Sequence, residues 1–79
     1  MVANQKLEEF ERKGEEAYVA MYSARPAAVK DYYEESRSQF RLAIEQANLR
    51  GAADEVARLE RRLAHIKAVY DNQFRGVGR

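Results

Sequence analysis

An all-α fold of three antiparallel helices is the structure that this 79-residue sequence predicts. In three segments, apolar or small residues recur at alternating steps of three and four, which places each set along one side of a helix. Pro26 and Gly51 interrupt the pattern, and the connections that they mark are short. Short connections make consecutive helices antiparallel. We therefore expect helices at about 4–24, 27–49 and 52–74, as a three-helix bundle or as a helical hairpin with one added helix.

The first helix is expected to begin at a cap supplied by Asn4, with Glu8 near its positive end. Its stripe consists of Leu7, Phe10, Gly14, Ala17, Met21 and Ala24. A glycine inside a helix costs about 1 kcal/mol relative to alanine. Gly14 therefore indicates a close crossing with another helix, and a hinge is the alternative interpretation.

The second helix is expected to follow Pro26, because proline suits the first turn of a helix, where its missing N–H is no loss. Its stripe consists of Val29, Tyr33, Ser36, Phe40, Ala43 and Ala47. Phe40 lies between the small residues Ser36 and Ala43, and a large side chain between two small ones predicts tight packing at this point.

The third helix follows Gly51, which suits the position just past a helix C-terminus, and begins with Asp54 and Glu55. Its stripe consists of Val56, Leu59, Leu63, Ile66 and Tyr70. Its end is expected to fray over residues 76–79.

A second face of the third helix, about 120° around it, consists of Ala53, Ala57, Ala64 and Ala68. Alanines permit close approach, so this face indicates a second neighbour, in the same chain or in a second copy. Alanines that merely favour a solvent-exposed helix are the alternative.

Composition predicts one domain over residues 1–79 with little stability to spare, since a domain of this size buries only about 60% of its unfolded surface. The chain has no cysteine and one histidine, which excludes disulfides, thiolate metal sites and multi-histidine sites, so we expect no cofactor. A partner chain remains as a source of extra stability. No apolar run approaches the ~20 residues that cross a bilayer, and no signal-peptide core is present. We therefore expect no membrane association and a cytoplasmic location.

Charge is balanced, with 14 basic and 13 acidic residues, but it is unevenly distributed. Residues 1–24 hold five acidic and three basic residues, whereas residues 51–79 hold four acidic and six basic ones. The opposite signs suit an arrangement in which the first and third helices are neighbours, and they suit pairing with a second copy equally well. A basic patch is expected on the third helix, consisting of Arg58, Arg61, Arg62 and His65.

The basic patch could contact phosphates or an acidic partner, and an ordinary solvated face is the alternative. A nucleic-acid partner is not expected, because the compensating acidic residues leave a net charge of only +1. Catalysis is not expected either. Cysteine and threonine are missing, and Ser23, Ser36 and Ser38 have only His65 as a base.

Three tyrosines, Tyr18, Tyr22 and Tyr32, lie beside the stripes of the first two helices. Tyrosine combines an apolar ring with a polar hydroxyl, which suits a half-wet protein interface, and the rim of a small core is the alternative. With the alanine face of the third helix, these tyrosines are the expected partner interface.

The spacing of Ser36, Phe40 and Ala43 resembles the small–aromatic–alanine pattern on the second helix of the tetratricopeptide repeat family. The segment 45–69 looks like the junction between two such repeats, with the turn at Gly51. The first helix departs from the family pattern, since Tyr18 lies one place late. The resemblance implies a three-helix unit that binds proteins or self-associates.

The function expected from these observations is a small helical protein–protein interaction module that could act as a homodimer, such as an adaptor, a chaperone-like protein or a regulatory subunit. Two alternatives remain open. One is a nucleic-acid-associated regulator that uses the basic patch. The other is an accessory subunit that needs a larger enzyme partner for its stability.

Overall fold

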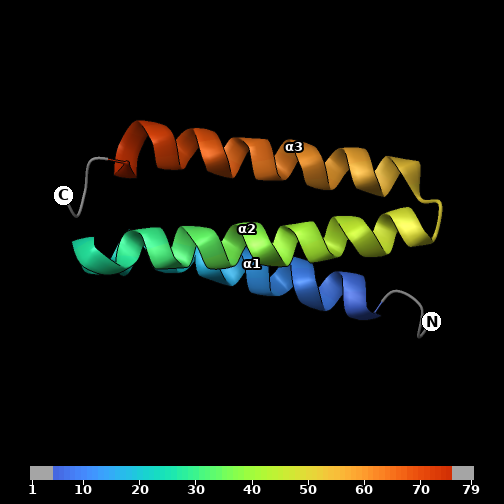
Figure 1. Ribbon diagram of the computed structural model, residues 1–79, viewed down its shortest axis with the longest axis horizontal. Helices are drawn as coiled ribbons and strands as arrows, with labels where there is room; N and C mark the ends of the chain where they lie inside the picture. Colours follow the sequence, from blue (N-terminus) through green and yellow to red (C-terminus); the bar gives the residue numbers. More distant parts are fainter. Residues whose placement is uncertain (1–4, 76–79) are drawn as a thin grey trace.

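The chain folds into three α-helices followed by one short π-helical segment, as the computed structural model shows for residues 5–75, which it describes (Figure 1). The segments are α1 Gln5–Ser23, α2 Pro26–Leu49, α3 Ala53–Val69 and η2 Tyr70–Phe74. Consecutive helices run antiparallel, and residues 5–75 contain no strand. The predicted all-α fold is therefore confirmed. The predictions for Asn4 and for the tail at 76–79 fall outside the described residues.

Proline and glycine end and begin the helices as expected. Pro26 occupies the first turn of α2. Gly51 adopts a φ of +67°, a left-handed conformation that glycine enters without steric cost. Its N–H donates to the Asn48 carbonyl at 3.0 Å, and the Ala52 N–H donates to the Ala47 carbonyl at 2.9 Å. These two bonds form a Schellman motif, which satisfies carbonyls left free at the end of α2.

The third helix differs from the prediction near its end, where α-helical geometry stops at Val69 and η2 continues the coil to Phe74. Aromatic rings hold this segment against the other helices. Tyr70 stacks on Tyr33 of α2, with ring centroids 3.9 Å apart and planes 5° from parallel. Phe74 meets Tyr22 of α1 edge to face at 5.1 Å. The chain therefore stays helical to the predicted residue, but with the wider turn of a π-helix.

The closest helix contact lies between α1 and α2, at Gly14. A Cβ atom built on Gly14 would lie only 2.6 Å from Cδ2 of Phe40, which is itself fully buried. The Ser36 hydroxyl donates to the Gly14 carbonyl at 2.8 Å, also in the core. This confirms the close crossing expected at Gly14 and the tight packing expected around Phe40. α1 passes through Gly14 as one unbroken helix.

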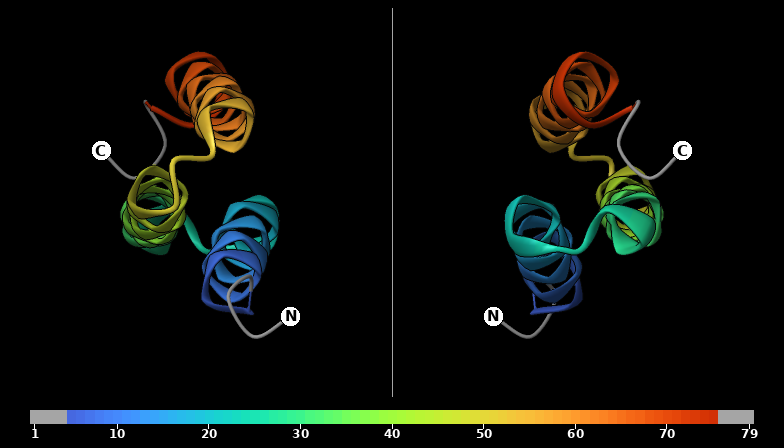
Figure 2. Two further views of the ribbon diagram at one scale, coloured as in Figure 1. Left: turned by 90° about the vertical axis from the view of Figure 1, so that its right-hand side faces the viewer. Right: turned by 90° about the vertical axis from the view of Figure 1, so that its left-hand side faces the viewer.

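The third stripe is less deeply buried than the other two. All six residues of the α2 stripe are buried, whereas in α3 only Leu59 and Ile66 are. Seen end on, the helices occupy the corners of a triangle (Figure 2). Val56, Leu63 and Tyr70 pack against the core but stay partly exposed. α3 therefore leaves part of its own apolar side, and part of α2, open to solvent.

Candidate protein-interaction site

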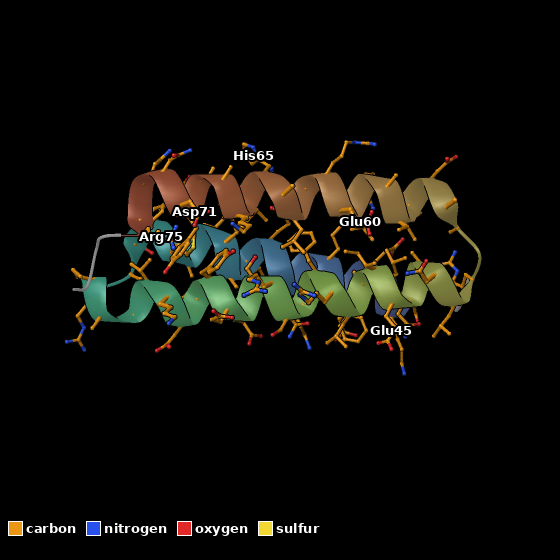
Figure 3. All side chains as sticks on the ribbon, turned by 45° about the horizontal axis from the view of Figure 1, so that its top comes forward. Glu45, Glu60, His65, Asp71 and Arg75 are labelled. Atoms are coloured by element: carbon orange, nitrogen blue, oxygen red, sulfur yellow. The ribbon has the colours of Figure 1, made fainter. Side chains whose placement is uncertain are left out.

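An open groove of about 930 Å³ runs along the outer side of α2 and α3. We call it the α2/α3 groove and define it by six of its lining residues: Arg41, Leu42, Glu45 and Leu49 of α2, and Glu60 and Leu63 of α3. Figure 3 shows Glu60 on the edge of α3 that faces α2, and Glu45 on α2. The groove exists because α2 turns its small residues towards α1, which leaves its opposite side uncovered.

The α2/α3 groove exposes large apolar side chains. Leu49 is 75% exposed and Leu42 is 38% exposed, while Ile44 and Leu63 are half-buried in the groove. Leu42 and Leu49 are seven residues apart, which is two helical turns, so they lie on the same side of α2. Single exposed leucines are ordinary on a protein surface, but several that converge on one groove are typical of an interaction site.

The charged residues of the α2/α3 groove have no ion-pair partner among residues 5–75. Arg41, Glu45 and Glu60 are all exposed, and none of them lies within 4.0 Å of an opposite charge there. This contrasts with the far side of the molecule, where most charged side chains of α1 and α3 are paired. The groove therefore combines exposed apolar surface with charges of both signs that are free to meet a partner.

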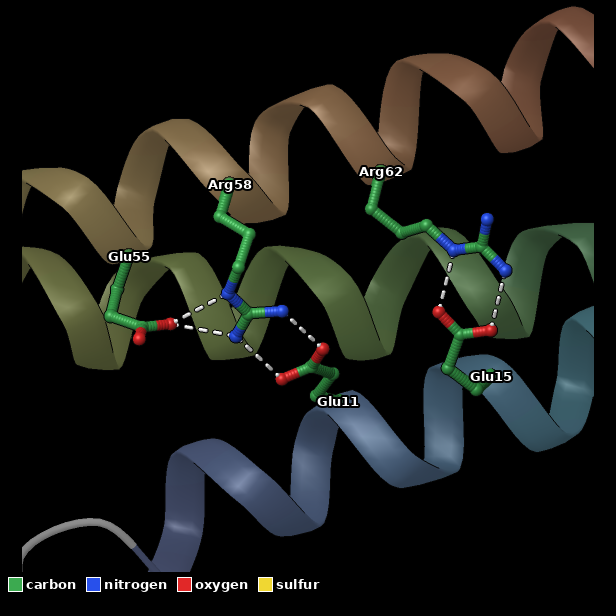
Figure 4. A network of polar contacts seen from close by, with 5 residues as sticks. All are labelled: Glu11, Glu15, Glu55, Arg58 and Arg62. Atoms are coloured by element: carbon green, nitrogen blue, oxygen red, sulfur yellow. Dashed lines mark hydrogen bonds and ion pairs between the residues drawn. The ribbon is translucent and has the colours of Figure 1, made fainter.

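The gap between α1 and α3 is spanned by two guanidinium–carboxylate pairs (Figure 4). Arg58 donates to both carboxylate oxygens of Glu11, at 2.7 and 2.9 Å, and also to Glu55 at 2.6 Å. One turn further along α3, Arg62 donates to both oxygens of Glu15, at 2.7 and 2.9 Å. The charge distribution of the sequence suited either the first and third helices as neighbours or pairing with a second copy, and these pairs show the first arrangement.

These contacts also set the electrostatics of the α1–α3 side. The hydrogen bond from Arg58 lowers the pKa of Glu11, and burial opposes this shift without reversing it. The bond to Glu11 likewise raises the pKa of Arg58, and the bond to Glu15 raises the pKa of Arg62. Both arginines are therefore paired with carboxylates of their own chain. The pairs are bidentate, which fixes the orientation of each guanidinium group.

The structure divides the predicted basic patch into two parts. Arg58 and Arg62 turn towards α1, where Glu11 and Glu15 neutralise them. Arg61 and His65 are exposed, and His65 lies on the edge of α3 away from α2 (Figure 3). Two of the four residues are therefore paired within the chain, because α3 is rotated so that they face Glu11 and Glu15 of α1. A role for the patch in binding stays a prediction.

The predicted tyrosine surface also needs correction. Tyr18 is buried, with only 9% of its surface exposed, and the Arg62 guanidinium lies 5.2 Å from its ring centroid. A hydrogen bond to Tyr22 at 3.1 Å raises the pKa of the Tyr18 hydroxyl. Tyr18 therefore belongs to the rim of the core rather than to a free surface. Tyr22 and Tyr32 remain exposed, at 54% and 40%.

The alanine face of α3 remains largely open in residues 5–75. Ala53, Ala64 and Ala68 are exposed and Ala57 is half-buried. At 100° per residue, Ala53 and Ala64 lie about 20° and 40° around α3 from Glu60. The alanine face therefore borders the α2/α3 groove, which extends the surface that a docked partner could approach closely.

Leu42 and Leu49 of the α2/α3 groove were not predicted as site residues, although the sequence contains a signal for them. Leu42 and Leu49 repeat at seven residues on the polar side of the second helix. Two leucines seven residues apart lie on the same side of a helix. Their spacing therefore indicates a second apolar contact on the polar side of the second helix, in addition to the stripe.

Within residues 5–75, no helix is long and apolar enough to cross a membrane. The same residues contain no group of three or more histidine or carboxylate side chains placed to hold a metal ion. Comparison of the chain with protein-family models, with curated proteins and with solved structures found no match.

Proposed function

We propose that this protein is a helical protein–protein interaction module, and that the α2/α3 groove is its binding surface. The observation that carries the proposal is the exposure of Leu42 and Leu49 in a groove whose charged residues have no partner in residues 5–75. Protein interfaces characteristically combine a desolvated apolar centre with polar groups at the rim. A binding helix could bury the leucines and meet the charges at the same time.

A binding role without catalysis fits the environment of two of the three serines, Ser36 and Ser23. Ser36 is fully buried and its hydroxyl donates to the Gly14 carbonyl, so it serves packing. Ser23 donates to the backbone of its own helix, at Ala20. The resemblance to tetratricopeptide repeats and the expected cytoplasmic location remain parts of the proposal.

The nucleic-acid alternative has less support. Phosphate binding needs free guanidinium or ammonium groups. Arg58 and Arg62 each pair with a carboxylate of α1, which leaves Arg61 and His65 as the exposed part of the predicted patch. A nucleic acid that bound through Arg58 and Arg62 would have to break the pairs that hold α3 against α1.

Site-specific photo-crosslinking tests the proposal. A photoreactive amino acid replaces Leu49 in the groove, and in a matched control it replaces Val19, which is 63% exposed on α1. We expect crosslinked protein adducts in the source cell from position 49 and none from position 19. If position 49 gives no adduct, or both positions give the same adducts, the groove is not the binding surface.

A further inference from the structure

We propose that the α2/α3 groove is occupied by a second copy of this chain, which docks about a twofold axis with the two α2 helices antiparallel. The inference rests on the proposed function and names the partner. In a twofold contact the same surface patch faces itself, so the patch must be complementary to itself. The two charged groove residues of α2, Arg41 and Glu45, and the apolar residues of the groove meet this requirement.

The charges of α2 are self-complementary in an antiparallel arrangement. Arg41 and Glu45 are four residues apart on α2 and both line the groove. If the twofold axis crosses α2 near residue 43, Arg41 of each copy lies opposite Glu45 of the other. One dimer then gains two symmetric ion pairs from side chains that have none in residues 5–75. A partner of a single charge sign would satisfy only Arg41 or only the two glutamates of the groove.

The apolar residues fit the same register. Leu42 lies next to the proposed axis, so the two copies bring their Leu42 side chains together at the centre. Leu49 comes near Ser38 of the second copy, whose small side chain leaves room for a leucine. On α3, the bordering Ala53 and Ala64 allow the second copy to approach closely.

The broad face seen in Figure 1 has room for a second copy. The molecule measures 42 × 19 × 13 Å, and this face shows α2 and α3, with α1 partly behind α2. The two larger extents, 42 and 19 Å, outline about 800 Å² for the whole molecule, and a protein interface of standard size buries roughly 800 Å² on each partner. A contact over the α2/α3 groove therefore covers part of this outline.

Charge reversal tests the pairing directly, with sedimentation equilibrium as the readout. We expect the parent chain to show twice its 9.1 kDa monomer mass at high micromolar concentration. Arg41→Glu alone, or Glu45→Arg alone, places two like-charge contacts in each dimer and should weaken association by about tenfold. An equimolar mixture of the two variants should regain the parent affinity, because positions 41 and 45 then carry opposite charges at both contacts of the mixed dimer.

An apolar substitution and its control complete the test. Leu49→Asp should weaken the dimer, and Val19→Asp, a change at a similarly exposed position on α1, should not. Circular dichroism checks that every variant is folded. A parent chain that is monomeric at 500 µM overturns the inference, and so does a dimer that ignores the charge reversals or is not rescued in the mixture. Crosslinks from position 49 to another protein, with a monomeric parent, would overturn the second copy as occupant but leave the proposed function standing.

Discussion

Replacing Gly14 with alanine has two opposing effects. It improves the helix propensity of α1, and it worsens the packing at the α1–α2 contact. Alanine is the better helix former by about 1 kcal/mol. However, the added Cβ would lie 2.6 and 2.7 Å from two atoms of the Phe40 ring, about 1 Å inside the preferred separation of carbon atoms. Phe40 is 0% exposed, so its ring has no open space to move into. We therefore expect α1 to move away from α2.

Three contributions determine how much Gly14→Ala changes the free energy of unfolding. Overpacking a core by a methyl group costs about 1–3 kcal/mol. Separating the helices also stretches the buried bond from Ser36 to the Gly14 carbonyl, 2.8 Å long, whose loss costs about 1 kcal/mol. The gain of about 1 kcal/mol in helix propensity offsets only the cost of losing the hydrogen bond. We expect Gly14→Ala to lower the free energy of unfolding by about 2 kcal/mol, which lowers the Tm by roughly 10 °C in a domain of this size.

Urea and thermal unfolding, followed by circular dichroism, measure this change. Ala64→Gly on the exposed side of α3 serves as the control for propensity and should cost about 1 kcal/mol. The double variant Gly14→Ala with Phe40→Leu should lose less than the two single variants combined, since the smaller side chain relieves the clash. If Gly14→Ala instead raises stability by about 1 kcal/mol, propensity dominates and the close contact has been misjudged.

Three further predictions concern the core, the ion pairs and the basic residues. Phe40→Ala should cost about 3–5 kcal/mol in urea unfolding, comparable to the whole stability of a small domain, and a melt within a few degrees of the parent would contradict this. Because Arg58 lowers the pKa of Glu11 from its ordinary 4.5, this carboxylate stabilises the fold above pH 4.5, and the contribution is lost as the pH falls through its lower folded value. Glu11→Gln should therefore cost about 0.5 kcal/mol at pH 7 and flatten the decline in stability below pH 4.5 in urea titrations at several pH values. Fluorescence anisotropy with duplex DNA or RNA should show no binding at about 0.15 M salt, whereas salt-dependent binding that Arg61→Glu abolishes would favour the nucleic-acid alternative.

The core contacts were predictable because they depend on periodicity and size within each helix. The spacing of Ser36, Phe40 and Ala43 indicated a large side chain between small ones, and Gly14 in the first stripe indicated the close crossing that receives it. The end of α2 at Gly51 was predictable for a similar reason, since its left-handed φ favours glycine. These features are local, and one sequence is enough to define them.

The candidate surface was less predictable because it depends on how the helices are rotated relative to one another. The directions of Arg58 and Arg62 depend on the angle between α3 and α1, and no stripe specifies that angle. Tyr18 is buried because it packs with the core and because the guanidinium of Arg62 on α3 lies over its ring. The groove at Leu42 likewise depends on α3 leaving one side of α2 uncovered. The charge distribution fitted the first and third helices as neighbours and a second copy equally well, and it did not indicate which arginine pairs with which glutamate.

A concentration series of methyl NMR spectra tests whether the α2/α3 groove contacts a second copy. The chain has five leucines, of which Leu42, Leu49 and Leu63 line the groove, while Leu7 and Leu59 lie in the core. Between low and high micromolar protein, we expect the three groove leucines to change shift or broaden, while the two core leucines and the exposed Val19 stay constant. Spectra that do not change at Leu42 and Leu49, or that change only on α1, would show that the groove does not contact a second copy.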